Sequence, residues 1–144
     1  MPPHFLIFSL ALSKVGNLAF KVVCSSYREL LVWQKAKSLA VHVYSATEAF
    51  PRSETYGLTS QARRAAVSVV SNIAEGQGRL TSNEFLHFQG IARGSLHELE
   101  AQLAIALDLA YLELGVYNRV AQELYQVLGL LNRLIDAIRR KRAS

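Results

Sequence analysis

Four long segments with helical hydrophobic spacing, separated by glycine and proline, most constrain what this chain can fold into. Within each segment apolar residues recur every three or four positions, which places them along one face of an α-helix. We expect these helices at about residues 27–49, 58–76, 81–111 and 116–140. Short loops between long helices favour antiparallel neighbours. The sequence therefore predicts an all-α protein, an antiparallel up-down-up-down four-helix bundle.

Capping residues set the expected ends of these helices. Ser25 or Ser26 is the expected N-cap of the first helix. Thr81 and Glu84 have the spacing of a capping box, in which each side chain bonds the other residue's backbone N–H. Glycines are expected to end the second helix and to separate the third from the fourth, namely Gly76, Gly78 and Gly115.

The N-terminal segment, residues 1–26, differs from the rest of the chain. Its apolar run Phe5–Leu12 is too short to span a bilayer. An export signal has positively charged residues before its apolar run, but no Lys or Arg precedes this one. An export signal, a poorly ordered extension and a short extra helix all remain open, with the extension favoured. We therefore divide the chain into an atypical N-terminal extension (1–26), the bundle (27–138) and a basic C-terminal tail (139–144).

The positive charge of the chain lies mostly outside the predicted bundle. The formal net charge is +5, yet residues 27–138 carry ten Lys/Arg against eleven Asp/Glu. The basic C-terminal tail can contact phosphates or simply aid solubility. The nucleic-acid-binding candidates are the tail residues and four bundle arginines: Arg139, Arg140, Lys141, Arg142, Arg63, Arg64, Arg79 and Arg93.

A second, polar stripe follows the second helix and continues on the third. Its small Ser and Asn residues indicate that another helix or another subunit covers it. We expect Arg64 or Arg63 to pair with Glu98 or Glu75, since a buried charge needs a partner. Within an oligomer we expect Arg64 and Glu98 to be at least partly buried. A structural network or interface is favoured over a ligand or nucleic-acid site. Its members are Gln61, Arg64, Ser68, Asn72, Glu75, Ser95 and Glu98.

Two features predict close helix contacts and self-association. Gly90 and Gly94 leave a shallow patch beside Ser95, which is typical of tight helix packing. The fourth helix is apolar over more than one face, so a lone monomer would expose apolar surface. We therefore expect a homo-oligomer.

The sequence offers no recognisable catalytic or metal-binding pattern. Glu84 and His87 form a single Glu-x-x-His pair, whereas di-iron bundles need two such pairs. His97-Glu98 lacks the second histidine of a zinc-protease helix. We expect no metal, no cofactor, no small-molecule substrate, no membrane span and no enzymatic activity. The single cysteine excludes an internal disulfide and suits the reducing cytoplasm.

Four longer motifs stand in order along the chain: Val32–Ala36, Tyr56–Ala65, Ser71–Arg79 and Gly94–Glu100. Through them the chain resembles the bacterial four-helix-bundle proteins called 23S rRNA-intervening sequence proteins, over about residues 27–138. The resemblance assigns no role to individual residues. It implies only that the following residues belong to the family's motifs: Arg63, Arg64, Asn72, Glu75, Arg79, Ser95, Glu98 and Glu100.

The resemblance also implies an assembly and a kind of function. Such proteins form ring-like homopentamers and are similar to the accessory protein of diversity-generating retroelements, which binds a reverse transcriptase and nucleic acid. We therefore expect a non-enzymatic oligomeric scaffold associated with RNA, DNA or a nucleic-acid enzyme. The alternative is a protein–protein adaptor bundle with no nucleic-acid contact.

Overall fold

The structure is a computed structural model that describes residues 26–143, and these form four long helices with two short 3-10 turns. The long helices are α3 (Leu31–Thr47), α4 (Leu58–Gln77), α5 (Ser82–Asp108) and α6 (Leu114–Ala143). The 3-10 turns are η1 (Tyr27–Glu29) and η2 (Arg52–Glu54). The expectations for the N-terminal extension fall almost entirely outside the described residues.

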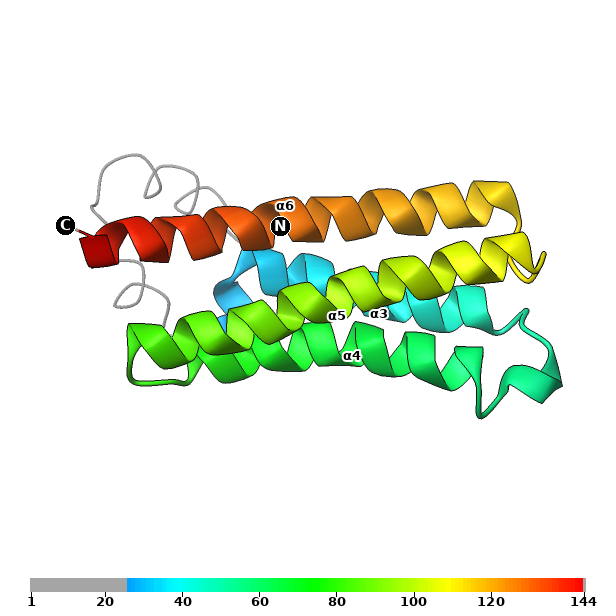
Figure 1. Ribbon diagram of the computed structural model, residues 1–144, viewed down its shortest axis with the longest axis horizontal. Coiled ribbons are helices and arrows are strands. Elements are labelled where there is room, and N and C mark those ends of the chain that lie inside the picture. The colour runs from blue at the N-terminus through cyan, green and yellow to red at the C-terminus, as the bar shows by residue number, and fades with distance from the viewer. Residues whose placement is uncertain (1–25, 144) are drawn as a thin grey trace, which may run out of the picture.

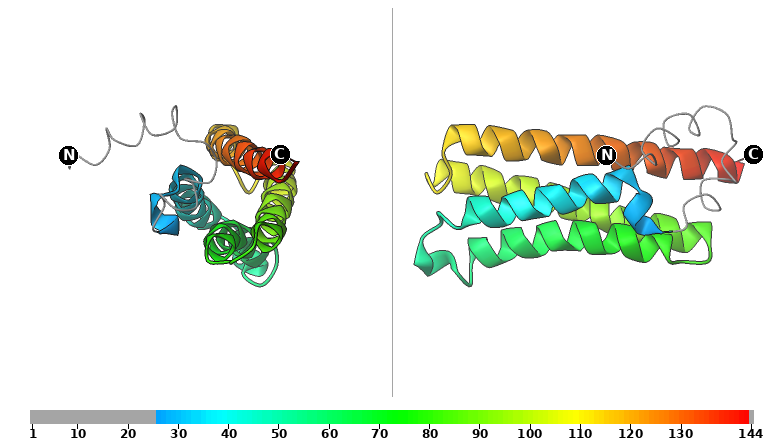
Figure 2. Two further views of the ribbon diagram at one scale, coloured as in Figure 1. Left: turned by 90° about the vertical axis from the view of Figure 1, so that its left-hand side faces the viewer. Right: turned by 180° about the vertical axis from the view of Figure 1, so that it is seen from behind.

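Consecutive helices run in opposite directions and lie roughly parallel to one long axis (Figure 1). The helices follow one another around a square, so that α3 contacts α4 and α6, and α5 contacts the same two helices (Figure 2). The predicted four-helix bundle is confirmed. The longest helix is α6, with 30 residues.

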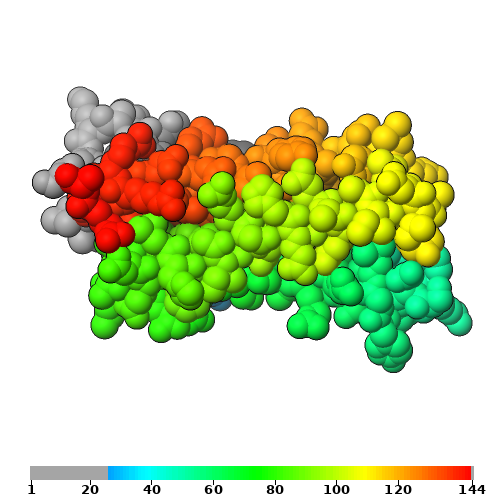
Figure 3. Space-filling view, viewed as in Figure 1, coloured from blue at the N-terminus to red at the C-terminus, as the bar shows by residue number. Residues whose placement is uncertain are grey.

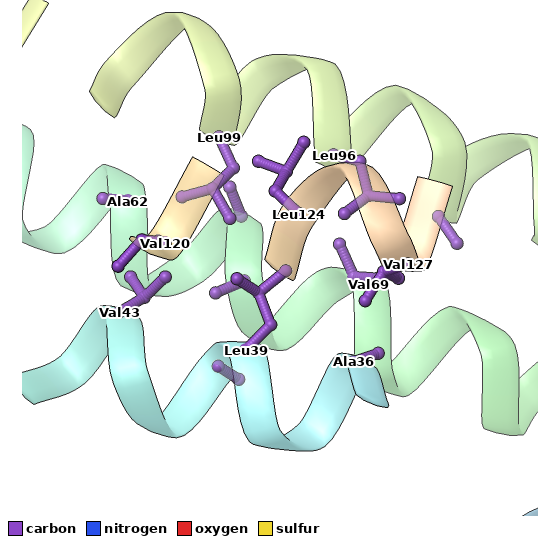
Figure 4. Close-up of a cluster of buried hydrophobic side chains, with 14 of the residues drawn as sticks. Ala36, Leu39, Val43, Ala62, Val69, Leu96, Leu99, Val120, Leu124 and Val127 are labelled. Carbon is purple, nitrogen blue, oxygen red and sulfur yellow. The ribbon is translucent and has the colours of Figure 1, made fainter. Parts of the chain in front are cut away.

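The core consists of one apolar row from each helix, as the hydrophobic spacing predicts. Leu39, Val69, Leu99 and Leu124 are all within 1% of complete burial and come from the four different helices (Figure 4). Alanines lie on the buried side of α4, which lets the neighbouring helices approach it closely. These are Ala62, Ala65 and Ala66.

The start of the first helix differs from the prediction. Ser26 does act as a cap, but it caps η1: its hydroxyl oxygen accepts a hydrogen bond from Arg28 N at 3.3 Å. Leu30 is then extended and almost completely buried, and α3 begins one residue later. The segment therefore bends after one turn so that Leu30 can enter the core.

The capping box at the start of α5 is confirmed. Thr81 Oγ1 accepts a hydrogen bond from Glu84 N at 3.2 Å, and Glu84 Oε2 accepts one from Thr81 N at 3.3 Å. Gly78 is the C-cap of α4, although its φ of −76° is right-handed rather than left-handed. Gly76 lies inside the helix, against α5.

The predicted separator between the last two helices is wrong. Gly115 lies in the first turn of α6, and the chain turns instead at Ala110, whose φ of 58° is left-handed. Ala110 N donates to Leu107 O at 3.0 Å and Tyr111 N donates to Ala106 O at 2.9 Å. These two hydrogen bonds form a Schellman motif, which satisfies the last carbonyls of α5.

The last helix extends further than predicted. Arg139–Arg142 continue α6 instead of forming a separate tail, and helical structure persists to Ala143. The positive charges of Arg140, Lys141 and Arg142 therefore lie in the last turn of a helix, where they interact favourably with the negative end of its dipole. The helix fixes the positions of these cations relative to the rest of the bundle.

Candidate nucleic-acid interface

Charge is separated along the length of the bundle. One half, residues 26–39, 68–94 and 129–143, holds ten Lys/Arg and four Asp/Glu, a net charge of +6. The other half, residues 40–67 and 95–128, holds four Lys/Arg and seven Asp/Glu, a net charge of −3. Four of the charges of the basic half come from Arg139–Arg142, which lie outside residues 27–138. Within that nearly neutral range the two halves carry net charges of +2 and −3.

The basic half contains the C-terminus of α6, the start of α3 and the turn that joins α4 to α5 (Figures 1 and 2). The C-terminus of α6 and the turn between α4 and α5 lie at one extremity, and the start of α3 lies further in (Figures 1 and 2). We call this region, with its residues Arg28, Arg79 and Arg139–Arg142, the basic end. Arg28, Arg139, Arg140 and Arg142 are exposed, whereas Arg79 and Lys141 are half-buried. The structure thus brings Arg79 to the same end as the four C-terminal cations.

Arg79 is held in place at this end by two contacts. Its guanidinium forms an ion pair with the Glu75 carboxylate one turn earlier, and its Cζ lies 4.5 Å from the centre of the Phe88 ring. Arg28, also part of the basic end, has a comparable contact with a ring. Arg28 lies over Tyr27 at 5.9 Å.

The other arginine candidates lie elsewhere. Arg63 Nε donates to Thr47 Oγ1 at 2.8 Å, Nη2 donates to Tyr44 O at 3.3 Å, and the guanidinium covers the Tyr44 ring. Arg63 therefore caps the end of α3. Arg64 is exposed in the acidic half, and Arg93 is exposed on α5 near the middle of the bundle. These three do not form one surface with the basic end.

Part of the predicted polar stripe forms a hydrogen-bonded network between α4 and α5. The hydroxyls of Ser68 and Ser95 are 2.8 Å apart. Asn72 Nδ2 donates to Ser68 O at 2.8 Å and to Ser68 Oγ at 3.1 Å. Ser95 Oγ also donates to Ile91 O at 3.0 Å. The small size of these side chains keeps the two helices close, which is a structural role.

The predicted charge pairs across the stripe do not form within the described residues. Glu75 pairs with Arg79 instead, because they are four residues apart on one helix face. Glu98 accepts a hydrogen bond from Gln102 Nε2 at 3.1 Å. Arg64 and Glu98 are exposed in the single chain, so their expected burial within an oligomer stays a prediction.

Arg64 and Glu98 instead border a shallow groove of about 690 Å³ that crosses α4. Gln61 and Ser68 line the same groove, together with Tyr44 from α3 and Val67. Three of the four exposed members of the predicted stripe, Gln61, Arg64 and Glu98, thus lie on one surface, and the fourth, Glu75, pairs with Arg79 elsewhere. The groove is open and has charges of both signs, which suits contact with another protein chain.

The expected close approach at Gly90 and Gly94 is also absent within the chain. Both glycines are exposed, and a Cβ at either position would meet nothing within 4 Å. They lie on the outer face of α5, which also exposes Ile91, Ala101 and Ile105. Figure 3 looks onto the side of the molecule where α5 lies between α4 and α6. No described helix of this chain covers that face.

The structure shows two further polar contacts that the sequence analysis missed. His42 Nδ1 lies 2.7 Å from Glu123 Oε2, across a groove of about 480 Å³ between α3 and α6. The Tyr125 hydroxyl donates to Glu100, and this hydrogen bond to a carboxylate, with its negative charge, raises the pKa of Tyr125. Both contacts join residues far apart in sequence, so no local spacing could have indicated them.

Buried glutamines are the other unanticipated feature. Gln89 is completely buried in the basic half and follows the core spacing of α5. Its Nε2 donates a long hydrogen bond of 3.5 Å to Ile73 O, and its Oε1 has no hydrogen-bond partner among the described residues. Its place in the apolar spacing of α5 could have indicated from the sequence that Gln89 is buried.

The described residues contain no group of three or more side chains suited to a metal ion. Within residues 26–143 none of the helices combines the length and apolar character of a membrane span.

Comparisons with known proteins agree with the architecture. No functionally curated protein matches the chain. Four solved chains match it. One is the crystal structure of a protein of unknown function from the S23 ribosomal protein family of Bacteroides thetaiotaomicron. That protein is 20% identical with a TM-score of 0.69, and the match covers 73% of this chain and 98% of that one. At this identity the likeness shows the fold alone.

A family model gives the assignment. The model described as 23S rRNA-intervening sequence protein matches residues 28–133, which include α3, α4, α5 and most of α6. This is more than half of the chain. The resemblance found in the sequence motifs is confirmed, and the chain belongs to the 23S rRNA-intervening sequence protein family.

Proposed function

We propose that this protein is a non-enzymatic, self-associating accessory protein of the cytoplasm that binds nucleic acid at its basic end or accompanies an enzyme that does. The separation of charge along the bundle carries the proposal. A net charge of +6 in one half creates a positive potential that attracts phosphates, whereas the acidic half repels them. Nucleic acid would therefore be oriented toward one end of the molecule.

The helical structure of the last residues supports the proposal. Arg139, Arg140 and Arg142 are exposed on a helix that is anchored in the core through Leu131 and Ile135. Cations on a fixed helix lose less conformational freedom on binding phosphates than cations on a flexible tail. The family name refers to a sequence within 23S rRNA, which is consistent with a setting near RNA.

A matched pair of charge variants tests this function. The double variant Arg139→Gln/Arg142→Gln removes two exposed charges from the basic end. The control Arg52→Gln/Arg119→Gln removes two exposed charges from the acidic half. Binding to RNA and DNA is measured over a range of salt concentrations. Each lost phosphate contact reduces the salt slope by about 1, so the first variant should flatten the slope and the control should not.

Two results would contradict the proposal. If the wild-type protein does not bind RNA or DNA at low salt, the nucleic-acid role is wrong. If the two double variants lose affinity equally, the attraction follows total charge and the basic end is not the site.

A protein–protein adaptor is the second candidate function. It is favoured by the groove across α4, where Arg64 and Glu98 offer charges of both signs, and by the exposed Ile91 and Ile105 on the outer face of α5. In that case the Arg139→Gln/Arg142→Gln variant would behave as wild type toward every nucleic acid. Substitutions at Arg64 or Glu98 would instead weaken partner binding.

Self-association is part of the main proposal. Apolar side chains are exposed on α4 and α5: Val67 by 43%, Ile91 by 40% and Ile105 by 51%. Gly90 and Gly94 lie between Val67 and Ile105 in sequence. Soluble monomers rarely present such surface over a large contiguous area. The family resemblance makes a cyclic pentamer the expected assembly.

A further inference from the structure

Aromatic rings accompany the cations in the basic half of the bundle. Three of the four cation–ring contacts among the described residues are found there. Arg28 lies 5.9 Å from the Tyr27 ring centre, Lys37 Nζ 5.5 Å from Trp33, and Arg79 Cζ 4.5 Å from Phe88. The rings are also paired: Tyr27 and Trp33 are 5.0 Å apart, and His87 and Phe88 are 5.3 Å apart.

These rings remain accessible. Tyr27, Trp33 and Phe88 are half-buried and His87 is exposed, so each presents part of its surface to solvent. One pair lies at the start of α3 and the other near the start of α5, and these two helices occupy opposite corners of the bundle (Figure 2). The only large aromatic side chain that is almost fully exposed among the described residues is Tyr56, at 97%, in the acidic half.

Rings and cations together are the combination by which proteins bind unpaired bases. In a single strand every base has an open face that can stack on an aromatic ring, while nearby cations contact the phosphates. In a duplex the bases are stacked on one another, so only phosphates and groove edges are available. Lys37 is a long, exposed side chain that can move from Trp33 to a phosphate and leave the ring face for a base. Arg79 is held by Glu75 and covers one face of Phe88.

The geometry points to single-stranded nucleic acid, RNA or DNA, as the ligand of the basic end, with bases stacked on Trp33 or Phe88. This inference rests on the proposed nucleic-acid function and narrows its ligand class. The acidic half has one cation–ring contact among its described residues, between Arg63 and Tyr44, and hydrogen bonds tie it to the end of α3. Its ring pair, Phe50 and Tyr111 at 5.7 Å, includes no cation, and Phe50 is buried.

The chain has one tryptophan, so Trp33 fluorescence reports on the basic half of the bundle. The full chain is titrated with oligouridine, with oligothymidine and with a duplex of equal length at the same ionic strength. We expect a single strand to quench Trp33 emission and to bind about tenfold more tightly than the duplex, as one stacked base contributes. Comparing the affinities for oligouridine and oligothymidine shows whether the protein prefers RNA or DNA.

A ring substitution tests stacking separately from charge. Phe88→Leu removes the ring and keeps apolar volume, and Tyr56→Leu is the matched control in the acidic half. Phe88→Leu should weaken single-strand binding by about fivefold or more, leave duplex binding unchanged and leave the salt slope unchanged. Tyr56→Leu should change none of these. Circular dichroism of both variants verifies that the bundle is folded.

The outcomes separate this inference from the broader proposal. Equal affinity for single strand and duplex, without quenching of Trp33, would overturn the inference while nucleic-acid binding itself stands. Equal weakening of both ligands by Phe88→Leu would also overturn it. Absence of binding to every ligand at low salt would remove the proposed function and the inference together.

Discussion

At the scale of single residues, Gly76 shows how the basic end is packed. A Cβ at Gly76 would lie 2.3 Å from Gln89 Nε2, 3.2 Å from Phe88 Cβ and 3.3 Å from Phe85 O. The Gln89 amide is completely buried and cannot swing into solvent, and the carbonyl belongs to the backbone of α5. Only glycine therefore allows α4 and α5 to approach this closely.

We predict that Gly76→Ala lowers the free energy of unfolding by about 1–3 kcal/mol, as overpacking does. Gly129→Ala is the control, because its Cβ would meet only Arg133 Nη2 at 3.9 Å. Alanine should raise stability there by about 0.5–1 kcal/mol through its helix propensity. Urea unfolding of both variants measures the difference, and a stabilised Gly76→Ala variant would contradict the packing argument.

Residue spacing predicted local features and could not predict which side chains meet across helices. The Thr81–Glu84 capping box depends on residues three apart, so the sequence revealed it fully. Arg63 and Arg64 are neighbours in sequence, yet one turns back to Thr47 and the other faces the groove. Consecutive residues of a helix point in widely different directions around its axis, and only the placement of α3 decides which arginine is held.

At the scale of elements, the turn between α5 and α6 depends on an unusual alanine. The φ of Ala110 is 58°, in the left-handed region. Left-handed backbone costs a residue other than glycine roughly 1–2 kcal/mol. The sequence could not reveal this turn, because the expected glycine stands five residues later and lies within α6. The Schellman hydrogen bonds and the burial of Leu112 hold the turn in place.

Ala110→Gly should therefore stabilise the protein. The relief of left-handed strain exceeds the entropic cost of glycine, which is about 0.5–1 kcal/mol. We expect a net gain of up to about 1 kcal/mol. The urea midpoint should rise without a change in slope, because the surface exposed on unfolding is the same. A lower midpoint would indicate that the turn is not left-handed in solution.

At the scale of the whole molecule, the proposed function involves two surfaces: the basic end for nucleic acid and the outer face of α5 for self-association. Charge separation needs the three-dimensional arrangement, because antiparallel helices bring together residues such as Arg79 and Arg139 that are far apart in sequence. A sum over the sequence averages the two halves. The basic end lies toward one extremity of the bundle, and the outer face of α5 lies along its side. Nucleic-acid binding and self-association can therefore occur together.

The outer face of α5 gives the last prediction, which concerns assembly. Gly94→Arg should fold normally, because a Cβ there meets nothing within 4 Å and the position is exposed. If that face contacts another copy, the arginine would clash at the interface and add an unpaired charge. Light scattering should then give several times 16.0 kDa for the wild type and a lower mass for the variant. Tyr56→Arg, in the acidic half, should keep the wild-type mass. A wild-type mass of 16.0 kDa at micromolar concentration would show that the protein is a monomer, and an unchanged mass for Gly94→Arg would place the interface on another face.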